Sequence, residues 1–267
     1  MGPGIRAPGI RAPGIRPARS RDTRYPGAGR PGAHLRYDGS AAARARPAAG
    51  PSLSITNHAM NIDDAHRIAD LDALTALYGQ PKDTSVLKES ATLHPNYRAF
   101  IRAAPFVALA TSGPGGLDVS PRGDAPGFVE IHDEQTLLLP DRRGNNRVDS
   151  LRNVIADPRV ALLFLIPGIG ETLRVNGRAQ ITVDPALLDK LAMDSKPPRS
   201  VLVVHVETVF FQCSRAVVRS RLWDPATQLR RDALPSTGRI LRDLIGSGFD
   251  GEQYDRELAD RVKKTLY

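Results

Sequence analysis

Five side chains that could bind an anion lie within one short segment of this chain. The segment from Asp141 to Arg147, DRRGNNR, contains the candidate residues Arg142, Arg143, Asn145, Asn146 and Arg147. An arginine guanidinium is planar and permanently charged, and it can donate two parallel hydrogen bonds to a phosphate group. A helix beginning behind the segment would add unpaired backbone N–H groups and the positive end of its dipole. The sequence therefore predicts a phosphate-binding turn, with a solvated polar loop as the alternative interpretation.

Two expected strands could carry further ligands for the same anion. In the segment 117–122, Ser120 and Arg122 alternate with apolar residues, so they would share one face of a strand. Arg174 lies on the polar face of the segment 171–183, which has the clearest alternation in the chain. We expect these three side chains to complete the site, although exposed strand faces would give the same pattern.

The helix expected behind the turn has a start, a buried stripe and an end in the sequence. Asn146 is placed to cap its first turn, so Arg147 would be its first residue. Val148, Leu151 and Ile155 follow at helical spacing and would form the buried stripe. Pro158 cannot continue a helix, so we expect it to terminate this one.

Most other elements read as strands. The run 160–166 is continuously apolar and is expected to be buried on both faces. Further strands are expected at 105–111, 117–122, 128–131, 136–139, 171–183 and 201–211, and helices at 61–78, 95–103, 185–193 and near the C-terminus. The first of these helices would be capped by Asn61 or Asp63. Because the strands follow one another too closely for βαβ crossovers, the sequence predicts a mainly β protein with α-helices. Its expected core is an antiparallel barrel of six or seven strands with flanking helices.

The positive charge of the chain is confined to its N-terminal part. The net charge is +8, and residues 1–52 alone contain ten arginines, two aspartates and neither lysine nor glutamate. The remainder is neutral overall, so only the arginine-rich tail is a candidate for binding nucleic acid. Residues 1–55 are rich in Arg, Pro and Gly and are expected to be disordered, whereas 60–267 should form the folded domain. Translation starting at Met60 is the alternative explanation for this tail.

Composition and spacing exclude several other classes of site. The six histidines never occur at metal-ligand spacing and Cys213 is the single cysteine, so neither a metal site nor an internal disulfide is expected. No apolar run approaches the ~20 residues that span a bilayer. We therefore expect a cytoplasmic protein without a membrane partner. The acidic residues show no pairing typical of acid–base catalysis, so no catalytic residue is assigned and a bound cofactor would supply the chemistry.

The order of these segments resembles one known family. The stretch from Leu137 to Ala179, with the runs LLPDRRGNNR, LRNVIADPRVALLF and ETLRVNGRA, is similar to the FMN-binding split-barrel flavoproteins related to pyridoxamine 5′-phosphate oxidase. The run FVALATSGPGGLDVSPRGD resembles their first hairpin. The run FFQCSRAVVRSRLWDP resembles the closing strand and helix of a bacterial subgroup of FMN-dependent enzymes. The resemblance covers residues 60–230 approximately.

This resemblance implies a split barrel that forms a homodimer with FMN at the subunit interface. The residues at the family's phosphate-binding positions are Ser120, Arg122, Arg142, Arg143, Asn146 and Arg147. Thr172 and Arg174 would lie near the flavin edge, with the partner subunit as one source of them, and Arg221 would lie near the isoalloxazine ring. The implied activity is oxidation or reduction of a small-molecule substrate by hydride transfer at flavin N5.

The chain also departs from the family pattern. Phe211 stands where the relatives carry a tryptophan, and the chain ends RVKKTLY without the Arg-Leu-x-Pro signature of true pyridoxamine phosphate oxidases. The substrate is therefore left open. Two alternatives remain: a deazaflavin-dependent reductase of the same fold, and a non-catalytic protein that binds a flavin or haem.

Overall fold

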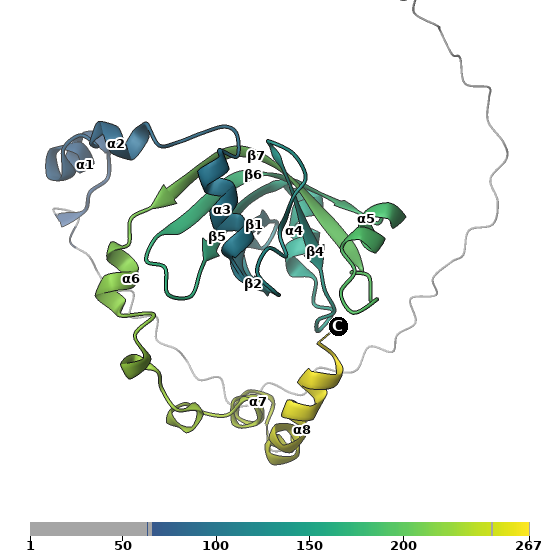
Figure 1. The fold of residues 1–267 in the computed structure, drawn as a ribbon. Helices are drawn as coiled ribbons and strands as arrows, with labels where there is room; N and C mark the ends of the chain where they lie inside the picture. Colours follow the sequence, from purple (N-terminus) through teal and green to yellow (C-terminus); the bar gives the residue numbers. More distant parts are fainter. Residues whose placement is uncertain (1–62, 64–65, 247, 267) are drawn as a thin grey trace, which may run out of the picture. The chain divides into compact units, whose positions relative to one another are not determined.

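The computed structural model describes residue 63, residues 66–246 and residues 248–266 (Figure 1). The predicted disordered tail, residues 1–55, and the alternative start at Met60 lie outside these residues. Residues 68–267 make up one unit of mutual contacts, and the elements below belong to it.

Seven strands form a single antiparallel sheet in the described part of the chain. The strands are β1 (Phe106–Gly113), β2 (Gly116–Gly123), β3 (Glu130–Ile131), β4 (Thr136–Asp141), β5 (Arg159–Leu165), β6 (Thr172–Thr182) and β7 (Ser200–Gln212). Their spatial order is β2-β1-β5-β6-β7-β4-β3, and every neighbouring pair is antiparallel. The prediction of a mainly β, antiparallel, six- or seven-stranded fold is confirmed.

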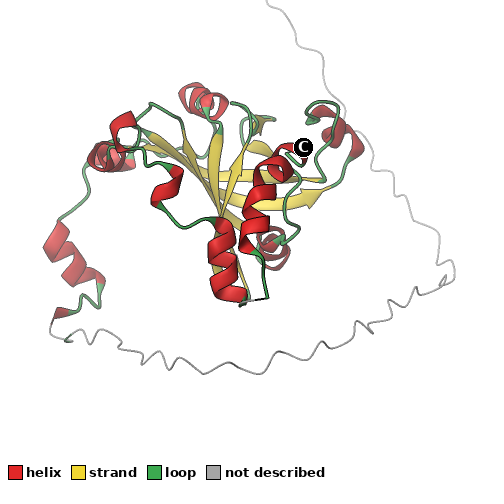
Figure 2. Ribbon diagram, turned by 90° about the horizontal axis from the view of Figure 1, so that it is seen from below, coloured by secondary structure: helices red, strands yellow, loops and turns green. Residues whose placement is uncertain are grey.

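Helices precede, interrupt and follow the strands along the chain (Figures 1 and 2). They are α1 (Leu71–Tyr78), α2 (Asp83–Val86), α3 (Pro95–Ala103), α4 (Asp149–Ala156), α5 (Pro185–Lys190), α6 (Arg215–Ser220), α7 (Thr237–Ile245) and α8 (Gly251–Lys264), with 3₁₀ turns η2 (Pro225–Thr227) and η3 (Arg231–Ala233). α3 packs against β3, β6 and β7, and α4 packs against β1, β2 and β6. These two are the flanking helices that cover the sheet near the predicted site.

The inner face of the curved sheet is apolar because alternate residues of each strand point toward it. The side chains buried there include Val107, Leu109, Leu162, Phe164, Leu173 and Val175. The alternation predicted for 171–183 is confirmed by β6. The expectation that 160–166 is buried on both faces is wrong, because Ala161, Leu163 and Leu165 on the outer face of β5 stay half-exposed.

The sheet is split between β2 and β4, which are not hydrogen-bonded neighbours. We call this gap the seam. Two ion pairs cross it. Arg142, just after β4, donates from Nε to Oδ2 of Asp124, just after β2, at 2.8 Å. Nη2 of Arg122 in β2 lies 3.6 Å from Oδ1 of Asp141 in β4. At the seam, ion pairs between side chains therefore connect two strands that share no backbone hydrogen bonds.

The helix behind the predicted phosphate-binding turn begins later than expected. α4 starts at Asp149, after Val148, which adopts the left-handed conformation with φ +49° and provides no side-chain cap. Asn146 is not the cap, because its side-chain oxygen accepts a hydrogen bond from Nη1 of Arg199 at 2.7 Å. This tertiary hydrogen bond uses the oxygen that would have capped the helix. Arg147 therefore precedes α4 rather than beginning it.

The buried stripe of α4 also differs from the prediction. Ser150 and Val154 are buried, whereas Val148 and Ile155 are 40% and 79% exposed. Leu151 packs against the core as expected. Ser150 turns inward because its hydroxyl donates to Oδ2 of Asp118 in β2 at 3.3 Å.

At the other end of the domain, the helix expected over 61–78 is shorter than predicted. Asp70, and neither Asn61 nor Asp63, caps α1, accepting a hydrogen bond from the N–H of Ala73 at 2.7 Å. Gly79 ends the helix as expected, with a φ of +72°.

Candidate functional site

The two faces of β2 reverse the usual arrangement of a strand, in which apolar side chains point inward and polar side chains point outward. The inner face presents Asp118, Ser120 and Arg122, all half-buried, while Leu117 and Val119 on the outer face are 88% and 65% exposed. In an isolated domain the hydrophobic effect would favour the reverse orientation. The hydroxyls of Ser120 and Ser150 both donate to Asp118 Oδ2, at 3.2 and 3.3 Å. β2 is therefore arranged to present polar groups inside the split barrel.

A cavity of about 240 Å³ opens at the seam beside Arg122. We call it the seam cavity. Its lining includes Arg122, Asp141, Arg142, Arg143 and Gly144. The structure thus brings together three of the predicted arginines from two different segments, because β2 and β4 approach each other there.

The three arginines of the seam cavity differ in their partners. Arg142 donates to Asp124 and also, from Nη1, to the carbonyl oxygen of Leu191 at 2.7 Å. Arg143 is exposed and makes no hydrogen bond or ion pair with any described residue. Arg122 donates weakly from Nη1 to its neighbour Pro121 at 3.4 Å, and its Nε is buried without a hydrogen-bond partner among the described residues. Among these three arginines, Arg122 is therefore the one with a buried donor nitrogen, Nε, that lacks an acceptor among the described residues.

Asp141 faces these cations from the end of β4. Its side chain is 16% exposed, and the 3.6 Å separation from Arg122 is too long for a hydrogen bond. Burial raises the pKa of Asp141, and the nearby charges of Arg122 and Arg199 offset only part of that effect. Sequence reasoning missed Asp141 and Arg199 as members of the site, since their proximity follows from strand pairing rather than from a motif.

Arg147, at the end of the turn, faces a different hollow. Asn145 accepts a hydrogen bond from the N–H of Arg147 at 3.1 Å, and the Arg147 guanidinium pairs with the carboxylate of Asp149. The hydrogen bond from the Arg147 guanidinium to Asp149 raises the pKa of Arg147. Arg147 lines a hollow of about 320 Å³ together with Asp118, Asp149 and Arg152. The turn therefore presents Arg142 and Arg143 to the seam cavity and Arg147 to the neighbouring hollow.

Thr172 and Arg174 lie on the other face of the sheet from Arg122. The strand register places Arg122 opposite Val107, Val107 opposite Phe164, and Phe164 opposite Leu173. Leu173 points inward, so its neighbours Thr172 and Arg174 point outward. Three strand spacings correspond to about 14 Å. Within one chain, the structure does not bring Arg174 to the seam cavity.

Outside the seam cavity, Arg174 and Arg221 have partners of their own. Cζ of Arg174 lies 5.5 Å from the centre of the Phe210 ring, within the range of a cation–π interaction. Arg221 donates to Oδ2 of Asp224 from Nε at 3.0 Å and from Nη2 at 2.6 Å. The pKa of Asp224 is lowered most by the hydrogen bond from the N–H of Ala226 and next by the hydrogen bond from Arg221.

A second pocket was not predicted from the sequence. Its volume is about 540 Å³, and its lining includes Lys88, His94, Tyr97, Phe100, Glu171 and Phe211. The Tyr97 hydroxyl donates to the Lys88 carbonyl oxygen at 2.6 Å, and Nζ of Lys88 lies 4.7 Å from the centre of the Phe211 ring. These residues come from separate segments, so no local pattern could have indicated the pocket.

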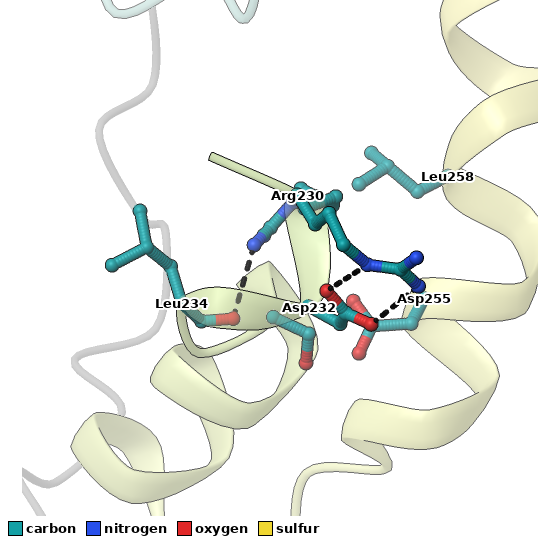
Figure 3. A pocket seen from close by; sticks show the side chains of 7 residues that line it. Arg230, Asp232, Leu234, Asp255 and Leu258 are labelled. Carbon is teal, nitrogen blue, oxygen red and sulfur yellow. Dashed lines mark hydrogen bonds and ion pairs between the residues drawn. The ribbon is translucent and has the colours of Figure 1, made fainter. Parts of the chain in front are cut away.

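A third pocket lies between η3 and α8 (Figure 3). It measures about 620 Å³ and is lined by Arg230, Asp232, Leu234, Asp255 and Leu258 among others. Arg230 pairs with Asp232 at 3.0 Å, and Asp255 accepts the N–H of Gly238 at 2.7 Å. The pKa of Asp255 is lowered most by the hydrogen bond from the Ser236 hydroxyl and next by the hydrogen bond from the N–H of Gly238. The charged groups drawn in Figure 3 thus find their ion-pair and hydrogen-bond partners within the same part of the chain.

The described residues provide neither a dinucleotide-binding loop nor a metal site. The run from Gly246 to Gly251 has G-x-G-x-x-G spacing, but it joins α7 to α8 and follows no strand, so it lacks the setting of a dinucleotide-binding loop. Within the described ranges, no three His, Cys, Asp or Glu side chains gather as a metal site requires. No helix in this part of the chain is both long enough and apolar enough to cross a membrane.

Comparisons with known proteins concern mainly the sheet. Residues 93–213 match the sequence model of the family described as pyridoxamine 5′-phosphate oxidase. No curated protein matches the chain significantly. Among solved structures, the chain is similar to HupZ of Group A Streptococcus, with 17% identity over 45% of this chain and 94% of that one and a TM-score of 0.38.

Two further solved structures are similar to the chain. One is a protein from Clostridium acetobutylicum related to general stress protein 26, with 15% identity over 44% of this chain and 86% of that one, and a TM-score of 0.36. The other is general stress protein 26 of Bacillus anthracis, with 17% identity over 43% and 88% and a TM-score of 0.33.

The family match begins at Leu93, just before α3, and ends at Cys213, just after β7, so it spans the whole antiparallel sheet and the seam cavity. It agrees with the sequence resemblance in both the segments and their order. Over residues 93–213, the chain is therefore similar to the family described as pyridoxamine 5′-phosphate oxidase, and these residues form an antiparallel sheet that is open at the seam.

Proposed function

We propose that this chain is an FMN-dependent oxidoreductase that acts in the cytoplasm, as a homodimer, on a small-molecule substrate. The observation that carries the proposal is the buried Nε of Arg122 in the seam cavity, which has no acceptor among the described residues. Leaving a buried donor unpaired costs about 1–3 kcal/mol, and more for a charged group. A ligand that brings an anionic oxygen to this position would remove that cost.

A phosphate group fits the chemistry of the cavity. Arg122 offers Nε, and Arg143 offers an exposed guanidinium that no described residue uses. Gly144 has nothing within 4 Å of the position of a Cβ, so its backbone is open to a ligand. The cavity measures about 240 Å³. The similarity of residues 93–213 to the pyridoxamine 5′-phosphate oxidase family supports FMN as the proposed source of this phosphate.

The other predicted residues have distinct parts in the proposal. Arg142 and Asn146 hold the turn in place through Asp124 and Arg199, so they position the phosphate site. Ser120 orients Asp118 at the inner face of β2. Arg147 lines the neighbouring hollow, and Asn145 holds the backbone of Arg147 in place.

When bound, FMN would supply hydride transfer at its N5 atom. The contribution of the protein is to hold fixed positive charge near the ring system, where it stabilises negative charge on the reduced cofactor. Arg174, restrained over Phe210, is the proposed source of that charge, with Thr172 as its neighbour on β6. Arg221 is proposed to lie at the ring from the segment after β7.

A second copy of the chain is the proposed partner. The outer face of β1, β2 and β5 is apolar and open: Leu117, Val119 and Phe106 are 88%, 65% and 39% exposed, and Leu163 and Leu165 are half-exposed. Contiguous apolar patches on a soluble protein mark interaction sites. A dimer would also bring the separated parts of the site together. A flavin that contacts both Arg122 and Arg174 needs residues from opposite faces of the sheet, and two copies of the chain can supply them.

Spectroscopy and flavin titration test this proposal. We expect the purified protein to show a flavin absorption spectrum, or the apoprotein to quench FMN fluorescence with one FMN per chain. Arg122→Ala removes charge-assisted hydrogen bonds of about 1.5–3 kcal/mol each, so FMN affinity should fall about 10- to 100-fold. Arg256→Ala, an exposed arginine on α8, is the control and should bind FMN as the wild type does.

Other outcomes would identify the alternatives. A protein that stays colourless and does not quench FMN contradicts the proposal. Tight binding of a deazaflavin in place of FMN would indicate the reductase of the same fold. A bound chromophore whose redox state does not respond to NADPH, oxygen or any reductant partner would indicate a non-catalytic binding protein.

A further inference from the structure

We infer that Asp141 makes cofactor binding proton-dependent: its carboxyl group takes up a proton when a phosphate group binds Arg122, and the resulting O–H donates to that phosphate. This inference rests on the proposed function, because it takes FMN as the source of the phosphate.

The geometry places Asp141 in direct competition with the phosphate. Its carboxylate lines the seam cavity beside Arg122 and Arg143, and its Oδ1 lies 3.6 Å from Nη2 of Arg122. No described residue donates a hydrogen bond to this carboxylate. A phosphate bound to Arg122 would therefore meet a second anion that is 84% buried and weakly held.

Every charged group that faces Asp141 comes from a neighbouring element. Arg122 faces it from β2, Arg142 and Arg143 share the lining of the seam cavity with it from the turn after β4, and Arg199 lies near it from the residue before β7. The other acidic residue at the seam is Asp124, which follows β2. The carboxylate of Asp124 is already held by Arg142 at 2.8 Å and by the N–H of Ala125 at 2.8 Å. Of the two acidic residues at the seam, Asp141 therefore has the negative charge that is less compensated by its neighbours.

Phosphate binding changes the balance at Asp141 in one direction. The phosphate shares the charge of Arg122 and adds repulsion at close range, and both effects disfavour the ionised carboxylate. Burial already raises the pKa of Asp141 in the absence of a phosphate. Once protonated, the carboxyl group has an O–H that can donate to a phosphate oxygen. The anion that would have opposed binding thus becomes a hydrogen-bond donor.

The sign of the pH dependence follows from this change. A group whose pKa is higher in the complex than in the free protein binds a proton with the ligand, so affinity is highest at low pH. FMN affinity should fall by up to tenfold per pH unit between the free and bound pKa values of Asp141, and then level off. The phosphate group itself titrates near pH 6, so measurements above pH 6.5 separate the two events.

The test compares wild-type protein with Asp141→Asn between pH 6.5 and 8.5. Asparagine has nearly the same shape, is neutral at every pH, and can donate to the phosphate. We expect the variant to bind FMN about tenfold more tightly than wild type at pH 8.5, with a flatter dependence on pH. Riboflavin, which has no phosphate, should show the same pH dependence in both proteins. Asp157→Asn, at the end of α4, is the matched control and should keep the wild-type profile.

Calorimetry of the wild-type protein gives an independent readout. FMN titrations at pH 7.5 in buffers of different ionisation enthalpy should show net proton uptake in wild type and less in Asp141→Asn. Parallel pH profiles in the two proteins, or no proton uptake by wild type, would overturn the inference while FMN binding stands. Absence of FMN binding in wild type at every pH would overturn the proposed function itself.

Discussion

At the scale of single residues, the two ion pairs of the seam have different consequences. The Asp124 side chain is 1% exposed and its bond to Arg142 is short, so this pair is a buried structural tie. Arg142 also holds the carbonyl oxygen of Leu191, which lies 49 residues away in the sequence. Arg122 and Asp141 are farther apart and line the cavity, so their charges are available to a ligand.

Truncating the structural tie should destabilise the fold. Arg142→Ala leaves the buried carboxylate of Asp124 without its cation, and breaking such pairs typically costs about 3–5 kcal/mol. Urea denaturation should show that loss in the free energy of unfolding. Arg143→Ala, the adjacent exposed arginine, is the control and should change stability by less than about 0.5 kcal/mol. Equal stability of the two variants would show that the Arg142 pair does not support the fold.

At the scale of elements, the sequence was informative where a local period decides the structure. From Thr172 to Gln180, β6 alternates between buried residues and residues that are half-exposed or exposed, and β7 runs from Ser200 to Gln212 around the predicted 201–211. α3 has the predicted bounds because Pro95 fixes its first turn. In each case, residues close in sequence contain the information.

The start of α4 and the composition of the seam cavity could not be predicted in this way. Asn146 has the right type for a helix cap, but Arg199, 53 residues away, takes its side-chain oxygen. The arginines of the turn were recognised as cations, whereas their partners Asp124 and Asp141 depend on how β2 meets β4. Only the folded sheet determines which arginine is left with an unpaired donor.

A close approach between two strands gives a prediction at this scale. The register of β6 and β7 shifts at Asn176 and Gly177, and a Cβ on Gly177 would lie 2.0 Å from the carbonyl oxygen of His205. Because that atom belongs to the backbone, Gly177→Ala forces the strands apart, and overpacking typically costs about 1–3 kcal/mol. Thermal unfolding should show a lower Tm. Gly115→Ala, with nothing within 4 Å, is the control and should leave Tm unchanged or slightly higher.

At the scale of the whole molecule, the outer face of β1, β2 and β5 is the surface that the proposed dimer would cover. Its strands present apolar side chains outward while β2 directs its polar residues inward. An interface of standard size buries about 800 Å² on each partner. The same association would place Arg174 of one chain within reach of a flavin whose phosphate lies at Arg122 of the other.

Charge introduced on this face should separate the copies. We expect Leu117→Lys to shift the protein from dimer to monomer in light scattering at micromolar concentration, because a buried unpaired charge opposes association. FMN affinity should fall in parallel, since each site is proposed to use both chains. Leu229→Lys, which alters an exposed leucine outside the sheet, should stay dimeric and keep its FMN affinity. A wild-type protein that is monomeric would contradict the proposed assembly.

The split in the sheet has one more consequence, which concerns solubility. β2 is an edge strand, and an unprotected edge can template the addition of strands from other chains and so begin aggregation. Pro121, near the end of β2, has no N–H to offer to an incoming strand, and Asp118 adds a charge along the same strand. The sheet can therefore stay open at the seam without becoming a nucleus for fibril growth.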